Sequence, residues 1–353
     1  MINEGSDIKV GKRMIENKGF GQIDNLYDRK ASGLNASDIE AAKVRIGAYV
    51  NKTPLEKSIY LSNSSHNVFM KLECQQPVKS FKIRGAMNRL LLLDEEEKKL
   101  GIATVSSGNH GIAVAYGAKL LNIKTVKIII PKTTPKSKID KIKYYGGQVM
   151  LMGSAYDEAH SLGMRYIRDS RLTYIDGGDE DPVVYAGQGT VTLELLEQNP
   201  DIDTILVPIG GGGLCTGTAV AAKSINKDIK VIGLYSEACP AWEACIRDGR
   251  LYHEYPSEES VCEAMVGGIG RLSYEMRDWL DGHLPVKEEY IRKAMVHAIF
   301  QEKIVAEASG SVPIAALLQY GAQIPGKNIA LIISGGNVNN ELLVSELKKN
   351  HAD

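Results

Sequence analysis

Residues 203–223 read DTILVPIGGGGLCTGTAVAAK, an apolar run that ends in four glycines and passes into a helix-forming segment. The run lacks the alternation of a half-exposed strand, which is typical of a parallel strand covered by helices on both faces. The amides of Gly210–Gly213 and the N-terminus of the following helix would then face one small anion, and phosphate is the natural occupant. A tight strand-to-helix crossing that merely needs small residues is the alternative.

The glycine run does not fit the common nucleotide-binding patterns. Leu214, Cys215 or Thr216 stands where G-x-G-x-x-G requires a glycine, and no lysine followed by serine or threonine ends the loop. A dinucleotide is therefore disfavoured. Cys215 is interpreted as a small packing residue.

Short apolar runs alternate with amphipathic segments on both sides of this stretch. This rhythm predicts parallel β-α-β units, and hence an α/β protein with open, buried sheets flanked by helices. The predicted strands are 68–72, 102–105, 126–130, 148–152, 203–209, 230–235 and 328–333.

The first firm helix is expected at Ser37-Asp38-Ile39-Glu40, which has the pattern of a capping box. Its apolar face would carry Ile39, Ala42, Ile46 and Tyr49. Residues 1 to 35 are polar and aperiodic, so we expect a partly ordered arm.

Composition favours a globular protein that binds small molecules over a nucleic-acid or membrane protein. The 353 residues can build two lobes, and the net charge of −1 gives no field that would attract nucleic acid or an anionic membrane. Five scattered cysteines indicate a reducing compartment. With no signal peptide and no apolar run of about 20 residues, a cytoplasmic protein with a small-molecule substrate is expected.

Four further segments follow predicted strands or open predicted helices. Three are polar turns at strand ends, where open parallel sheets bind ligands: Ser106-Ser107-Gly108-Asn109-His110-Gly111, Ser236-Glu237 and Ser334-Gly335-Gly336-Asn337. The fourth, Ser80-Phe81-Lys82-Ile83-Arg84-Gly85-Ala86, places Lys82 between apolar neighbours at a helix start. Desolvation would lower the pKa of such a lysine and make it a nucleophile toward an aldehyde, although a solvated helix end is the commoner situation.

The order of these motifs resembles the fold-type II family of pyridoxal-phosphate enzymes, in the threonine dehydratase and serine racemase branch. The resemblance runs from about Thr53 to Leu343 and includes Ala186-Gly187-Gln188-Gly189-Thr190 and Glu307-Ala308-Ser309-Gly310. It implies a tryptophan synthase β-like fold of two twisted, mostly parallel sheets. It also implies a large cofactor domain of residues 1–94 and 161–353, a small mobile domain of residues 95–160, and a homodimer.

The resemblance also implies roles for individual residues. Lys82 would hold pyridoxal 5′-phosphate as a Schiff base and shuttle the substrate Cα proton, with Phe81 against the ring. Gly210, Gly211, Gly212, Gly213 and Leu214 would bind the phosphate, and Asn109 the phenolic oxygen. Ser106, Ser107, Gly108, Asn109 and His110 would hold the substrate carboxylate.

Two serines bear on the reaction. Ser334 would face the pyridine nitrogen, and a neutral hydroxyl there weakens the ring as an electron sink, which favours β-elimination. Ser107 would stand opposite Lys82 and could protonate the other face, as in similar racemases, or it could only bond carboxylate or backbone. The leading function is therefore a dehydratase that converts serine, threonine or a related β-hydroxy amino acid to a 2-oxo acid and ammonia. An amino-acid racemase using Lys82 and Ser107 is the alternative, and a β-replacement synthase and a non-catalytic binding protein are weaker ones.

The resemblance suggests one further ligand. Glu237, the carbonyl of Ala241 and Glu243 would bind Mg²⁺ or Ca²⁺ as in the racemase branch. The sequence departs from the family around Cys239-Pro240 and at Cys262-Glu263-Ala264-Met265, which puts the metal and the substrate in doubt.

Two other groups of residues are interpreted as structural. The seven lysines between Lys124 and Lys143 are interpreted as a solvated helix face. His110 is interpreted as part of the Ser106 turn rather than as a general base, since the histidines show no ligand spacing.

Overall fold

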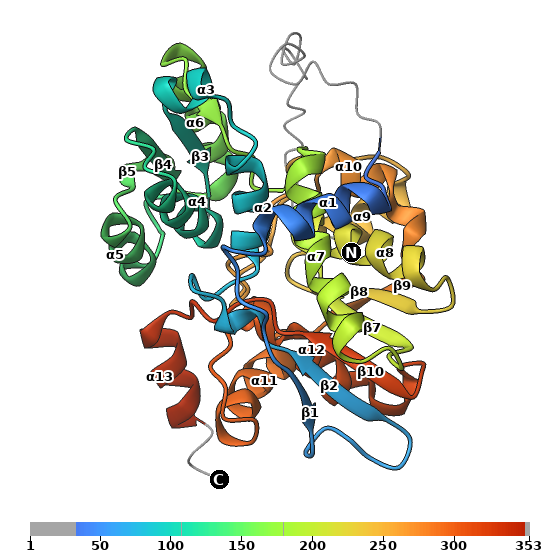
Figure 1. Ribbon diagram of the computed structural model, residues 1–353. Helices are drawn as coiled ribbons and strands as arrows, with labels where there is room; N and C mark the ends of the chain where they lie inside the picture. Colours follow the sequence, from blue (N-terminus) through green and yellow to red (C-terminus); the bar gives the residue numbers. More distant parts are fainter. Residues whose placement is uncertain (1–32, 107, 179, 350–353) are drawn as a thin grey trace, which may run out of the picture. The chain divides into compact units, whose positions relative to one another are not determined.

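The computed structural model describes residues 33–106, 108–178 and 180–349, and its elements are labelled in Figure 1. Residues 1–32 of the predicted N-terminal arm lie outside the described residues. Thirteen α-helices are present in this part of the chain. They are α1 Ala36–Ile46, α2 Lys82–Leu90, α3 Glu95–Leu100, α4 Asn109–Leu120, α5 Lys136–Tyr144, α6 Tyr156–Asp169, α7 Pro182–Gln198, α8 Gly213–Ile225, α9 Ala241–Asp248, α10 Arg271–Glu275, α11 Glu288–Phe300, α12 Ala308–Tyr320 and α13 Asn340–Lys349.

The larger sheet has six strands in the order β1-β2-β10-β7-β8-β9. Every neighbouring pair is parallel except β1 with β2. The strands are β1 Leu55–Ser58, β2 Asn67–Lys71, β7 Thr204–Pro208, β8 Lys230–Ser236, β9 Gly282–Val286 and β10 Asn328–Ile332. Because β2, β10 and β7 are adjacent and parallel, their carboxyl ends lie at one edge of the sheet.

The smaller sheet has four parallel strands in the order β5-β4-β3-β6. They are β3 Ile102–Val105, β4 Val126–Ile130, β5 Gln148–Leu151 and β6 Thr173–Tyr174. Helices α4 and α6 both contact β3 and β4. Strand β6 adds an edge to this sheet beyond residue 160, where the expected small domain ends. The division into a large domain and a small mobile domain stays a prediction.

The apolar runs of the sequence fill the two cores. Strand β7 is buried at every position, as the absence of alternation predicted, and β10 is buried at all but its first residue. One buried cluster surrounds the larger sheet and includes Leu206, Ile232 and Leu331. A second packs around β3, β4 and α4 and includes Ile102, Ile112 and Ile128. In the described part of the chain, no helix is both long and apolar enough to cross a membrane.

All seven predicted strands are present, with bounds that differ by one residue at most. Strands β1, β6 and β9 were not predicted. Strands β1 and β9 are the outer strands of the larger sheet, where solvent on one side tolerates the charges of β1 and Pro285 in β9.

The predicted helix cap was wrong by two residues. The cap of α1 is Asn35, whose side chain accepts from the amide of Asp38 while the Asp38 carboxylate accepts from the amide of Asn35. Ser37 lies inside the helix and its hydroxyl donates to Asn35. The predicted apolar face is correct for Ile39, Ala42 and Ile46, which are buried.

Candidate active site

The glycine loop after β7 has a backbone that side chains would obstruct. Gly212 caps α8 with a φ of 102°, in the left-handed region, and a Cβ there would overlap the buried side chain of Ser273. A Cβ on Gly210 would lie 2.8 Å from the carbonyl oxygen of Ala264. Helix α8 starts at Gly213, so its first backbone amides have no partner within the helix and face the loop. Such amides fit a phosphate group.

Lys82 is tied to the end of β10 through the backbone. The Phe81 amide donates to the carbonyl oxygen of Ser334 at 3.0 Å, and Ser80 forms a β-bridge with Gly335. Lys82 is the first residue of α2, and its Nζ donates to the carbonyl oxygen of Gly177. The Nζ atom lies 5.3 Å from the centre of the Phe81 ring. The lysine, the phenyl ring and Ser334 are therefore brought together, as the resemblance implied.

The turn after β3 is organised by Ser106. Its hydroxyl oxygen accepts from the amides of Gly108 and Gly111, both at 2.9 Å. Gly108 has a φ of 136° and packs against the side chain of Lys138. Ser107 lies outside the described residues, so its role stays a prediction.

His110 is fully enclosed behind this turn. Burial, with the charge of Lys82 adding to it, lowers the pKa of His110 to about 3. Its Nε2 atom lies 3.3 Å from the carbonyl oxygen of Ile175. The imidazole is therefore neutral at physiological pH.

Asn109 is held from two sides. Its Nδ2 donates to Glu307 at 2.5 Å, and its Oδ1 accepts from Nδ2 of Asn337 at 2.9 Å. Burial raises the pKa of Glu307 above its ordinary value, although Lys138 and the bond from Asn109 oppose the rise. Glu307 and Asn337 belong to the motifs Glu307-Ala308-Ser309-Gly310 and Ser334-Gly335-Gly336-Asn337, but neither was predicted to be a site residue.

The interpretation of the lysine-rich segment as a solvated helix face was wrong for two residues. The Lys138 side chain is 3% exposed and pairs with Glu263 at 2.8 Å. Lys141 is half-buried and donates to Oδ1 of Asn337 at 2.5 Å. Their spacing of three residues places both lysines on one face of α5, but lysines on a solvated face have the same spacing, so the sequence did not mark these two.

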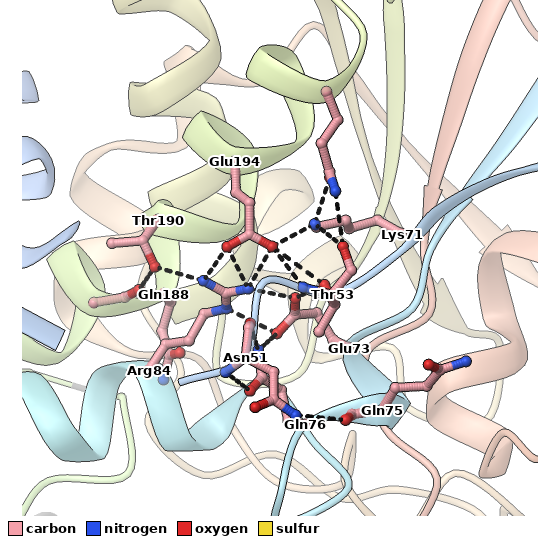
Figure 2. A network of polar contacts seen from close by, with 12 residues as sticks. Asn51, Thr53, Lys71, Glu73, Gln75, Gln76, Arg84, Gln188, Thr190 and Glu194 are labelled. Atoms are coloured by element: carbon pink, nitrogen blue, oxygen red, sulfur yellow. Dashed lines mark hydrogen bonds and ion pairs between the residues drawn. The ribbon is translucent and has the colours of Figure 1, made fainter. Parts of the chain in front are cut away.

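Arg84, two residues after Lys82 in α2, is the centre of a buried ion network (Figure 2). Its guanidinium bonds Glu73 at 2.7 and 2.8 Å and Glu194 at 3.2 Å. Lys71 donates to Glu194 at 2.5 Å. Burial alone would lower the pKa of Arg84, but Glu73 and Glu194 outweigh it and the net pKa is raised. The network anchors the first turn of α2, which carries Lys82.

The predicted cation site gains no support. Glu237 is exposed, and Glu243 accepts from the Tyr235 hydroxyl at 2.9 Å and lies 3.5 Å from Nδ1 of His283. No group of three or more His, Cys, Asp or Glu side chains in the described ranges could hold a metal ion. All five cysteines are free and buried, and burial raises the pKa of Cys215, in accord with its predicted packing role.

The sequence matches the model of a known protein family over most of its length. A family model described as "Pyridoxal-phosphate dependent enzyme" matches residues 46–335. The chain belongs to this family. Its fold and its pyridoxal-phosphate cofactor are therefore those that the sequence resemblance implied. The residues present fit this group, since the loop before α8 offers backbone amides for a phosphate and Lys82 offers an amine for an aldehyde.

Individual relatives cover most of the chain. An L-threonine ammonia-lyase of Thermotoga maritima is 37% identical over 307 residues, which is 86% of this chain and 76% of that protein. The catabolic L-threonine dehydratase TdcB of Staphylococcus aureus is 38% identical over 313 residues, which is 86% of this chain and 89% of that protein. The solved structure of maize serine racemase is similar with a TM-score of 0.81 and 34% identity, covering 91% of this chain and 98% of that one.

Proposed function

We propose that this pyridoxal-phosphate enzyme is an ammonia-lyase that converts serine, threonine or a related β-hydroxy amino acid to a 2-oxo acid and ammonia. One observation carries the proposal. Strands β2, β10 and β7 are neighbours and parallel, and the segments that follow them supply Lys82, Ser334 and the Gly210–Gly213 loop. A covalent anchor, a ring contact and a phosphate site therefore meet at one sheet edge.

The cofactor, when bound, withdraws electrons from the substrate Cα. Lys82 would hold it and then take the Cα proton, with Phe81 packed beside the ring. Gly210–Gly213 and Leu214 would bind the phosphate through backbone amides, and Asn109 would donate to the phenolic oxygen. The turn from Ser106 to His110 would hold the substrate carboxylate in place.

Ser334 favours elimination over transamination. Its side chain is a neutral hydroxyl, so it cannot keep a proton on the ring nitrogen as a carboxylate would. The electron pair left at Cα by removal of its proton would then form a Cα–Cβ double bond as the Cβ–O bond breaks, and the β-hydroxyl group would leave, once protonated, as water. The names of the two L-threonine lyases among the relatives agree with this reaction.

A racemase is the second candidate, supported by the likeness to maize serine racemase and by Ser107. Lys82 and Ser107 would then exchange the Cα proton on opposite faces. Incubation with L-serine and L-threonine, with 2-oxo acid and D-amino acid measured together, separates the two reactions. The Ser107→Ala variant should lose racemisation and keep elimination of the L-substrate. Equal loss of both would contradict the two-face role of Ser107.

Three expectations from the sequence remain proposals. Closure of residues 95–160 over the substrate would exclude water from the site. A reducing, cytoplasmic setting accords with the five free cysteines. A homodimer is the proposed assembly, and sedimentation of the purified protein tests it. A divalent cation at Glu237, Ala241 and Glu243 would raise the melting temperature on addition of Mg²⁺ or Ca²⁺, and unchanged melting would remove it.

A further inference from the structure

A continuous chain of polar contacts connects Lys141 on α5 with Glu307 at the start of α12. Lys141 donates to Asn337 at 2.5 Å, Asn337 donates to Asn109 at 2.9 Å, and Asn109 donates to Glu307 at 2.5 Å. The three members after Lys141 are almost fully buried, with exposures of 4%, 5% and 7% for Asn337, Asn109 and Glu307. Buried amides without partners are costly, so these contacts fix the side chains firmly.

The direction of the chain follows from the chemistry of its two ends. A lysine ammonium can only donate, so Asn337 must turn its oxygen toward Lys141 and its Nδ2 toward Asn109. Asn109 must then accept with Oδ1 and direct its own Nδ2 to Glu307. The Nδ2 group of Asn337 also donates to the carbonyl oxygen of Val78 at 2.9 Å, which favours the same orientation.

Glu307 preserves this direction in both of its protonation states. A carboxylate accepts with either oxygen, and a neutral carboxylic acid still accepts with its carbonyl oxygen. The far end of the chain is therefore an acceptor throughout. One N–H of the Asn109 amide is used by Glu307, and the second N–H stays directed away from it.

We propose that Lys141 is a positioning residue that orients the Asn109 amide, through Asn337, so that the second Nδ2–H of Asn109 faces the phenolic oxygen of the cofactor. This inference rests on the proposed function, which gives Asn109 that contact. Lys141 does not itself touch the cofactor in this arrangement. A reversed Asn109 amide would place Oδ1 against the phenolic oxygen, and two acceptors would repel each other.

Three substitutions at position 141 distinguish orientation from general stability. Lys141→Arg keeps a group that only donates, Lys141→Met removes the donor, and Lys141→Glu replaces it with an acceptor that favours reversed amides. Lys143→Met is the matched control, since Lys143 is exposed on the same helix. For each purified protein, the dissociation constant of pyridoxal 5′-phosphate and the visible absorbance of the bound cofactor are measured, and thermal melting checks the fold.

The proposal predicts a graded series. Lys141→Arg and Lys143→Met keep the wild-type dissociation constant within about twofold, Lys141→Met raises it about fivefold, and Lys141→Glu raises it on the order of ten- to a hundredfold. The long-wavelength band should weaken in the same order, because an N–H bond to the phenolic oxygen stabilises the form with charge on that atom.

Several outcomes of these measurements would contradict the role proposed for Lys141. Equal constants and equal spectra across the Lys141 series would overturn the inference, and so would a Lys141→Glu protein that binds as tightly as Lys141→Arg. If Asn337→Ala folds with an unchanged spectrum, the chain does not orient Asn109. A visible band that survives Lys82→Ala would instead overturn the proposed function, so the two failures are separable.

Discussion

The amide of Phe81 donates to the carbonyl oxygen of Ser334 at a distance of 3.0 Å. This bond joins the segment that carries Lys82 to the end of β10, an inner strand of the larger sheet. Ser80 bridges Gly335 on the other side of the same contact. The position of Lys82 relative to Ser334 is therefore set by the backbone and not by a flexible side chain.

The glycine loop provides a first prediction. Gly212→Ala should weaken cofactor binding at least about tenfold, because its Cβ would displace Ser273 and disturb the Tyr185–Ser273 hydrogen bond of 2.8 Å. Titration of the apoprotein with pyridoxal 5′-phosphate measures the effect. Gly249→Ala is the control, since Gly249 also has a positive φ of 63° but open space around it. That variant should lose about 1 kcal/mol of stability and keep wild-type cofactor affinity. If Gly212→Ala and Gly249→Ala lost cofactor affinity equally, the loss would come from backbone strain and not from the displacement of Ser273.

Arg84 provides a second prediction. Arg84→Met leaves the buried Glu73 without its ion-pair partner and removes one of the two cations that bind Glu194, and breaking a buried ion network in this way should cost about 3–5 kcal/mol of unfolding free energy. Urea unfolding followed by circular dichroism measures the loss. Lys98→Met removes a surface pair with Glu95 and should cost less than about 1 kcal/mol. An Arg84→Met protein as stable as wild type would show that the network does not anchor α2.

His110 provides a prediction about pH. Its pKa is about 3 in the folded protein against 6.5 ordinarily, so between these values the unfolded chain binds one proton more. The stability that His110 contributes is present above pH 6.5 and is lost as the pH falls toward 3, by about 1.4 kcal/mol per pH unit. His110→Gln should flatten the curve of unfolding free energy against pH by that slope. Parallel curves for the two proteins would contradict the buried, neutral histidine.

Glu73 should act in a lower pH range. Burial alone would raise its pKa, but Arg84 outweighs this and the net pKa lies below the ordinary 4.5. Its stabilising contribution is thus complete above pH 4.5 and disappears as the pH falls through the lowered value. Glu73→Gln should be less stable than wild type at neutral pH, and the difference should shrink in acid. A constant difference from pH 7 to pH 3 would contradict this assignment.

Much of the fold was predictable because its signals are local. The run Ile329–Ile333 is apolar throughout and Val126–Ile130 is interrupted only by Lys127, as expected for buried strands of parallel sheets, and the predicted strands follow both runs closely. Strand β9 left no such signal, because Gly282, His283 and Pro285 interrupt its apolar residues.

The site was predictable in its motifs and not in its connections. Gly210–Gly213 and Lys82 stand out because each needs an unusual local environment, a side-chain-free loop and a helix start between apolar residues. The contacts Lys141–Asn337 and Asn109–Glu307 join segments far apart in the chain, so no local pattern reports them. Lysines that reach a buried partner have the same spacing as lysines on a solvated face, which is why the segment Lys124–Lys143 was misinterpreted.

Lys82 is the one side chain proposed to bind the cofactor covalently. Borohydride reduction of the protein with its pyridoxal 5′-phosphate, followed by peptide mapping, locates the bond. We expect a single stable adduct on the peptide containing Ser80-Phe81-Lys82, and none in Lys82→Ala. An adduct on another lysine, or a wild-type protein that gives no adduct, would contradict it.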